Sequence, residues 1–97
     1  MNNSITLNNW HTIELKEMMN TFHAHFPTAQ QMPNIQLVKE LQSLKQATLT
    51  LIENRTESTV YQIIESRTVY QVFASGTFDE FESYEEYTKA QPIDKLQ

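Results

Sequence analysis

TVYQIIESRTVYQVFASG, residues 59–76, contains nearly the same pattern twice: Thr-Val-Tyr-Gln, followed by large apolar residues and a serine. Its β-branched and aromatic residues lack helical spacing, which predicts strand. The stretch is longer than a single strand usually is, so we expect a break near Ser66 and Arg67. The repeat therefore predicts a β-hairpin with strands at about 59–65 and 68–75.

The length of the hairpin loop decides which side chains share a face of the sheet. A two-residue loop at Ser66 and Arg67 places Gln62 opposite Gln71. One face then holds Val60, Gln62, Ile64, Val69, Gln71 and Phe73, and the other holds Tyr61, Ile63, Tyr70, Val72 and Ala74. A three-residue loop would mix these sets, because a shift of one residue exchanges the two faces of a strand.

Two helices are predicted before the hairpin. Apolar residues at three- and four-residue steps predict a helix over about 9–26, and Pro27 ends it. The same spacing predicts a second helix over about 33–46. Residues 48–53 could continue that helix, but their threonines and isoleucine favour a strand.

A third helix is predicted after the hairpin, over about 77–90. Thr77-x-x-Glu80 and Ser83-x-x-Glu86 both match a capping box, in which a hydroxyl and a carboxylate bind unpaired backbone amides. Either position is therefore a possible start of this helix.

These elements predict an α+β fold in one domain, residues 1–97, that ends in a tail at 91–97. Their order is α-α-β-β-β-α, and we expect an antiparallel three-stranded meander with the helices packed on one face. The alternative is a mostly helical chain with one β-hairpin, which follows if residues 48–53 are helical. A hydrophobic content of 39% favours a folded domain over a disordered chain.

The net charge of −5 is concentrated near the C-terminus. Residues 1–75 hold five basic and six acidic side chains, whereas residues 76–97 hold two basic and six acidic ones. No cluster of lysine and arginine is present, so we expect no direct binding to nucleic acid. No apolar run reaches the length of a signal peptide or of a membrane span, so we expect a cytoplasmic protein without membrane contact.

Motifs for catalysis and for cofactor binding are missing from the sequence. There is no cysteine, which removes thiolate chemistry and cysteine-ligated zinc. His23 and His25 are two residues apart, so a helix points them to different sides. The chain also lacks a P-loop, a glycine-rich dinucleotide turn and a Gly-x-Ser-x-Gly elbow. We therefore predict a protein that is not an enzyme and has no cofactor or metal.

The segment FDEFESYEEY, residues 78–87, alternates aromatic and acidic side chains. On a helix its rings would dock on the sheet and its acids would stay in water, which explains the spacing without any function. A sharper hypothesis is that the acids imitate nucleic-acid phosphates and bind a basic protein surface or a nucleoprotein complex. The predicted partner-binding acids are Asp79, Glu80, Glu82, Glu85 and Glu86.

Tyr61 and Tyr70 are a second candidate for partner binding. They lie outside if the helices cover the opposite face of the hairpin, and tyrosines beside aliphatic residues are typical of interfaces. A second copy of the chain is one partner that such a patch fits. If the helices cover the tyrosine face instead, the patch does not exist.

The sequence favours a small acidic inhibitor that occludes a basic, nucleic-acid-binding site on a partner protein. Its size, charge and lack of catalytic motifs are similar in type to inhibitors encoded by phages and mobile elements, such as anti-CRISPR proteins. This is a similarity of type only, because no motif identifies a family. The alternatives are an immunity or antitoxin protein and a structural or regulatory homodimer.

Overall fold

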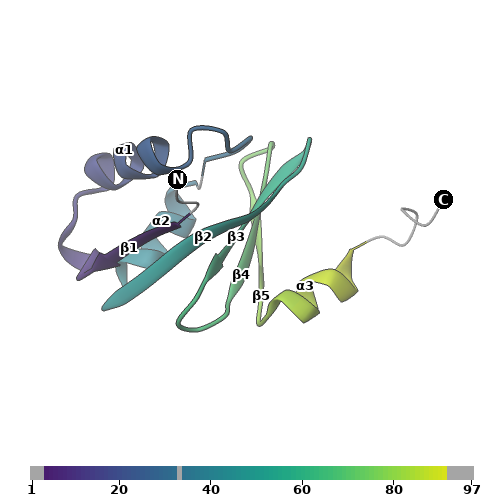
Figure 1. Cartoon of the computed structure of the whole chain (residues 1–97). Helices are drawn as coiled ribbons and strands as arrows, with labels where there is room; N and C mark the ends of the chain where they lie inside the picture. The colour runs from purple at the N-terminus through teal and green to yellow at the C-terminus, as the bar shows by residue number, and fades with distance from the viewer. Residues whose placement is uncertain (1–3, 33, 92–97) are drawn as a thin grey trace.

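The computed structural model describes residues 4–32 and 34–91. Within these residues the chain forms an α+β fold built on a five-stranded antiparallel sheet (Figure 1). The strands are β1 (Ser4–Asn8), β2 (Gln46–Asn54), β3 (Ser58–Ile63), β4 (Val69–Phe73) and β5 (Phe78–Phe81). The helices are the 3₁₀ helix η1 (Trp10–Thr12), α1 (Leu15–His25), α2 (Ile35–Gln42) and α3 (Tyr84–Ala90). The strand order in the sheet is β1-β2-β3-β4-β5.

The α+β class is confirmed, but the three-stranded meander is wrong because two further strands extend the sheet. The sequence analysis does not predict β1, because polar and apolar residues alternate there over only five positions, which is a weak strand signal. β5 lies inside the segment predicted as a helix over 77–90. β2 confirms the strand interpretation of 48–53 and rules out the mostly helical alternative.

The two N-terminal helices are shorter than predicted. Asn9 adopts a left-handed backbone conformation, with φ of 60°, directly before η1, and the extended backbone of Ile13 and Glu14 divides the predicted helix over 9–26 into η1 and α1. Asn34 caps α2, and its side-chain oxygen accepts a hydrogen bond from the Leu37 amide at 2.9 Å. Among the described helices, none combines the length and the apolar character that a bilayer crossing requires. The predicted tail lies, after residue 91, outside the described residues.

The register of the hairpin differs from the prediction by two residues. Gln62 lies opposite Val69, whereas a two-residue loop would place it opposite Gln71. The connection is longer, and Arg67 within it takes a positive φ of 65°. Because the shift is an even number of residues, every side chain keeps its predicted face.

The main core lies between α1, α2 and the face of the sheet that carries the hairpin tyrosines. Tyr61 is fully buried, its ring centroid lies 5.4 Å from that of Phe26, and its hydroxyl donates to the Gln31 carbonyl at 2.7 Å. The Trp10 indole N–H donates to the Ala47 carbonyl at 3.2 Å. The other buried members are Ile5, Met18, Phe22, Leu37, Val38, Leu41, Leu49, Ile63, Tyr70 and Val72.

The prediction that Tyr61 and Tyr70 face solvent is wrong. Their exposed fractions are 0% and 5%, because α1 and α2 cover the tyrosine face. The helices bring most of their large apolar side chains to this face, and burying one such side chain contributes about 1.5–3 kcal/mol. The exposed tyrosine patch on which the predicted homodimer interface depends therefore does not exist.

A smaller apolar cluster forms where α3 packs on the opposite face of the sheet (Figure 1). Its buried members are Val60, Val69 and Tyr87, and the partly buried Ile52 and Phe81 pack against them. A register irregularity in β2, between Leu51 and Glu53, follows a pair of consecutive residues that face opposite sides of the sheet, as strand residues do. Leu51 packs on the main core, and Ile52 packs on the smaller cluster.

Ile63 and Ile64 are neighbours in sequence, but their exposed fractions are 2% and 51%. We predict that Ile63→Ala lowers the free energy of unfolding by about 2–5 kcal/mol, because it leaves a cavity in the main core. Ile64→Ala is expected to change this free energy by less than about 0.5 kcal/mol. Urea unfolding followed by Trp10 fluorescence measures both. A larger cost for Ile64→Ala would mean that the opposite face of the hairpin is the buried one.

Candidate functional site

The acidic segment 78–87 is not one helix. Residues 78–81 form β5, and α3 begins only at Tyr84. The capping box at Thr77 is therefore wrong, whereas Ser83 does cap α3, and its hydroxyl oxygen accepts a hydrogen bond from the Glu86 amide at 3.2 Å.

The strand places the two rings of β5 in different parts of the molecule. Phe78 lies opposite Val72 and packs on the main core. Phe81 lies opposite Val69 and packs on the smaller cluster. Each ring is thus partly buried on its own side of the sheet, and this arrangement fixes the direction of the acids between them.

The five predicted acids do not form one stripe. Asp79 and Glu80 point to opposite faces of β5, because they are consecutive residues of a strand. Glu82 lies in the bend before α3. Glu85 and Glu86 stand in the first turn of α3 and lie 3.9 and 3.8 Å from the Lys89 ammonium. The helical phosphate-like stripe is therefore wrong.

The acids of the segment differ in how far they are neutralised. Lys89 compensates Glu85 and Glu86 in part, as exposed pairs within one helix do. Asp79, Glu80 and Glu82 are exposed, and no lysine or arginine among the described residues lies within ion-pair distance of them. The uncompensated negative charge of the segment is thus concentrated on β5 and the bend that follows it.

A further carboxylate, Glu40 of α2, meets Glu80 beside the sheet. Burial raises the pKa of Glu40, and the charge of Glu80 and a hydrogen bond with its carboxyl group raise it further. The sequence carries no signal for this pair, because the two residues come together only when α2 packs across the sheet. We call Glu40, Asp79, Glu80 and Glu82 the acidic edge.

Tyr70 lies beside this carboxyl pair. It is directly opposite Glu80 in the sheet and 5% exposed. Burial raises the pKa of its hydroxyl, and the charges of Glu80 and Glu40 add to the effect. The hydroxyls of the other three tyrosines all donate, Tyr61 to the Gln31 carbonyl and both Tyr84 and Tyr87 to the Glu53 carboxylate. No buried side-chain nitrogen or oxygen lacks a partner among the described residues, so the Tyr70 hydroxyl, which makes no side-chain hydrogen bond there, reaches solvent.

On the α3 side, by contrast, a partly buried carboxylate is fully engaged. Glu53 accepts hydrogen bonds from Tyr84 at 2.8 Å and from Tyr87 at 2.7 Å. The Arg55 guanidinium lies 3.2 Å from the same carboxylate and 5.9 Å from the centre of the Tyr87 ring. These contacts hold α3 on the sheet and leave little free charge there.

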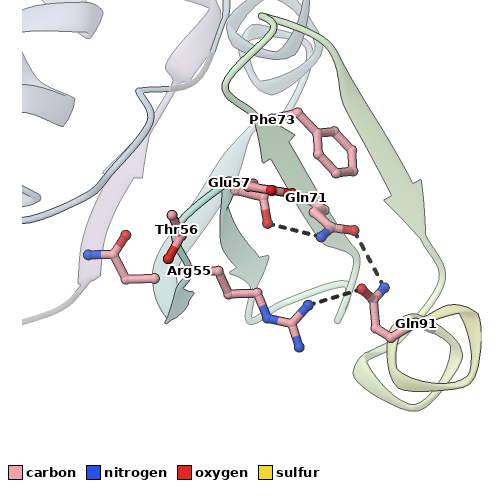
Figure 2. A pocket seen from close by; sticks show the side chains of 8 residues that line it. Arg55, Thr56, Glu57, Gln71, Phe73 and Gln91 are labelled. Atoms are coloured by element: carbon pink, nitrogen blue, oxygen red, sulfur yellow. Dashed lines mark hydrogen bonds between the residues drawn. The ribbon is translucent and has the colours of Figure 1, made fainter. Parts of the chain in front are cut away.

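A shallow polar pocket of about 590 Å³ lies beside the C-terminal end of α3 (Figure 2). Gln71 donates to the Ser58 hydroxyl at 3.0 Å and accepts a weak bond from Gln91 at 3.4 Å. Arg55 donates to the side-chain amide oxygen of Gln91 at 3.1 Å. The polar side chains of the pocket thus bind one another in a chain from the sheet to α3, and we interpret this pocket as a structural junction.

Comparisons with family models, with curated proteins and with solved structures find no significant match to this chain. The functional argument therefore depends on the geometry of the acidic edge.

The buried tyrosines predict an alkaline loss of stability. Burial raises the pKa of Tyr61, Tyr70 and Tyr87 above its value of 10.0 in the unfolded chain. The unfolded state then releases these protons first, so stability is complete below pH about 10 and falls as the pH rises above it. Urea unfolding at stepped pH measures this fall, which Tyr87→Phe is expected to make less steep. An unfolding midpoint that stays constant well above pH 10 would contradict the assignment.

Proposed function

We propose that this chain is a non-catalytic binding protein that uses its acidic edge to occupy a basic surface on a partner protein. The observation that carries the proposal is the set of exposed carboxylates on and beside β5 that have no described cation near them. Complementary charge steers the encounter of two proteins and selects the correct partner.

Edge strands often carry charges simply to prevent aggregation, and Asp79 and Glu80 on β5 fit that explanation as well. It does not account for Glu40, which belongs to a helix and whose carboxyl group is brought against that of Glu80. Two carboxyl groups held together are unfavourable in the free protein and become favourable when a cation binds. The Glu40–Glu80 pair therefore favours a role in partner binding over a role in preventing aggregation.

The form of this function that we favour is inhibition, in which the acidic edge blocks a nucleic-acid-binding groove of the partner. Such a groove presents lysines and arginines to phosphates, and carboxylates on a folded scaffold compete for the same cations. Inhibitors of the phage or mobile-element type act on partners of this kind. An immunity or antitoxin protein would use the same chemistry on a different target.

The double substitution Asp79→Asn with Glu82→Gln is expected to weaken partner binding about tenfold or more, because it removes two uncompensated charges from the interface. The matched control, Glu14→Gln with Glu17→Gln, changes the net charge equally but lies on α1 and the residue before it. Capture of the partner by the immobilised protein is compared at low and at high salt. Added duplex DNA is expected to displace the captured partner. Equal capture by both double variants would contradict the proposal.

A second candidate function, a homodimer, is favoured by the other edge of the sheet. β1 pairs only with β2 among the described strands, and its sequence SITLN has no charge to discourage a second strand. This candidate predicts a concentration-dependent dimer that the exposed Thr6→Lys converts to a monomer. Light scattering after size exclusion measures it, and a monomer at every concentration would exclude it.

A further inference from the structure

We infer that β1 pairs with β1 of a second copy of the chain about a two-fold axis at Thr6, which joins two five-stranded sheets into one continuous sheet. This inference rests on the homodimer named above as the second candidate function, and it fixes the register of that interface. It does not depend on partner binding by the acidic edge.

The hydrogen bonds of β2 show which way the backbone of Thr6 points. Thr48 of β2 lies directly opposite Thr6. Both backbone groups of Thr48 are used on the other side, where its amide donates to the Glu65 carboxylate at 2.7 Å and its carbonyl accepts from the Ile64 amide at 3.0 Å. Thr6 and Thr48 are therefore a non-hydrogen-bonded pair, and the amide and carbonyl of Thr6 point away from the sheet.

The same alternation identifies the other free backbone groups of β1. The Asn9 amide donates to the Lys45 carbonyl, so the bonded pairs fall on the odd-numbered residues of this segment. Ser4, Thr6 and Asn8 thus direct their amides and carbonyls outward. No described residue hydrogen-bonds to these groups, because β1 forms one end of the sheet (Figure 1). Such a row of free donors and acceptors is a template for another strand.

The distribution of charge favours a second copy as the occupant. β1 has no charged residue, no proline and no irregularity in its register with β2. The opposite edge strand, β5, carries Asp79 and Glu80. Because β1 and β5 are the two ends of the strand order, pairing through β1 joins the neutral edges and keeps the acidic ones farthest apart. The net charge of −5 on each chain therefore opposes this arrangement least.

Symmetry selects the register of the two strands. In a two-fold interface, if residue i contacts residue j of the second copy, then j contacts i. An axis at Thr6 sets Thr6 opposite its own copy and Ser4 opposite Asn8 of the second copy. All the outward groups then pair, with about six backbone hydrogen bonds. An axis at Ile5 leaves Asn8 without a pair within β1, and an axis at Leu7 leaves Ser4 without one.

The test uses introduced thiols, since the chain has no cysteine of its own. Under mild oxidation Thr6→Cys is expected to form a disulfide-linked dimer, because directly opposite residues lie about 5.5 Å apart between Cα atoms, within the reach of a disulfide. The matched controls Ser4→Cys and Asn8→Cys are each expected to stay largely unlinked, because two copies of either residue lie about 14 Å apart along the strands. Non-reducing gel electrophoresis measures all three variants.

A mixture of the two controls tests the register directly. Equal amounts of Ser4→Cys and Asn8→Cys are expected to form a mixed disulfide dimer that neither variant forms alone, and mass spectrometry identifies it. Urea unfolding of the reduced variants checks that each is folded. Thr6 and Asn8 are exposed and Ser4 is half-buried, so changes within about 0.5 kcal/mol of the wild type are expected.

The outcomes separate this inference from the homodimer itself. If light scattering shows a wild-type dimer but the Thr6→Cys variant links no faster than the two controls, the homodimer stands and the register is wrong. If the wild type is a monomer at every concentration, both fail, and the β1 edge is left to a strand of a different protein. Partner capture by the acidic edge is measured separately and is not decided by either result.

Discussion

Burial of the tyrosine face of the β3–β4 hairpin beneath α1 and α2 is the constraint on which the rest of the structure depends. The helices place Trp10, Phe22 and Phe26 near this face, and Tyr61 completes the packing with its ring and its hydroxyl. With this face covered, α3 has only the opposite face to pack on. The position of α2 across the sheet also brings a helical carboxylate to the edge strand. Core packing and surface charge therefore have a common origin.

The sequence predicted the faces of the hairpin but not which of them is buried. Alternation assigns Ile63 and Val72 to one face and Val60 and Val69 to the other, and a loop of different length left those sets intact. Both sets are apolar, so local pattern cannot choose between them. The choice depends on where the large helical side chains converge, which is a property of the whole fold. The exposed tyrosines of the prediction fail for that reason.

The candidate site was predictable only in part. Asp79, Glu80 and Glu82 could be recognised by charge, but the three-residue spacing of Phe78 and Phe81 suits a helix as well as a strand that contacts two cores. Glu40 carries no local signal at all, since its partner is distant in sequence and depends on helix placement. The fold pairs the Glu53 carboxylate with the Arg55 guanidinium and with two tyrosine hydroxyls. It leaves the negative charges of the acidic edge without a cation.

The unequal size of the two apolar clusters has a consequence for how the molecule opens. α3 is held by a cluster with only Val60, Val69 and Tyr87 fully buried, and its polar contacts with β2 converge on Glu53. Segments with few buried contacts exchange amide hydrogens and meet proteases at a lower free-energy cost than the global transition. The C-terminal helix is therefore expected to open at a lower free-energy cost than the larger core.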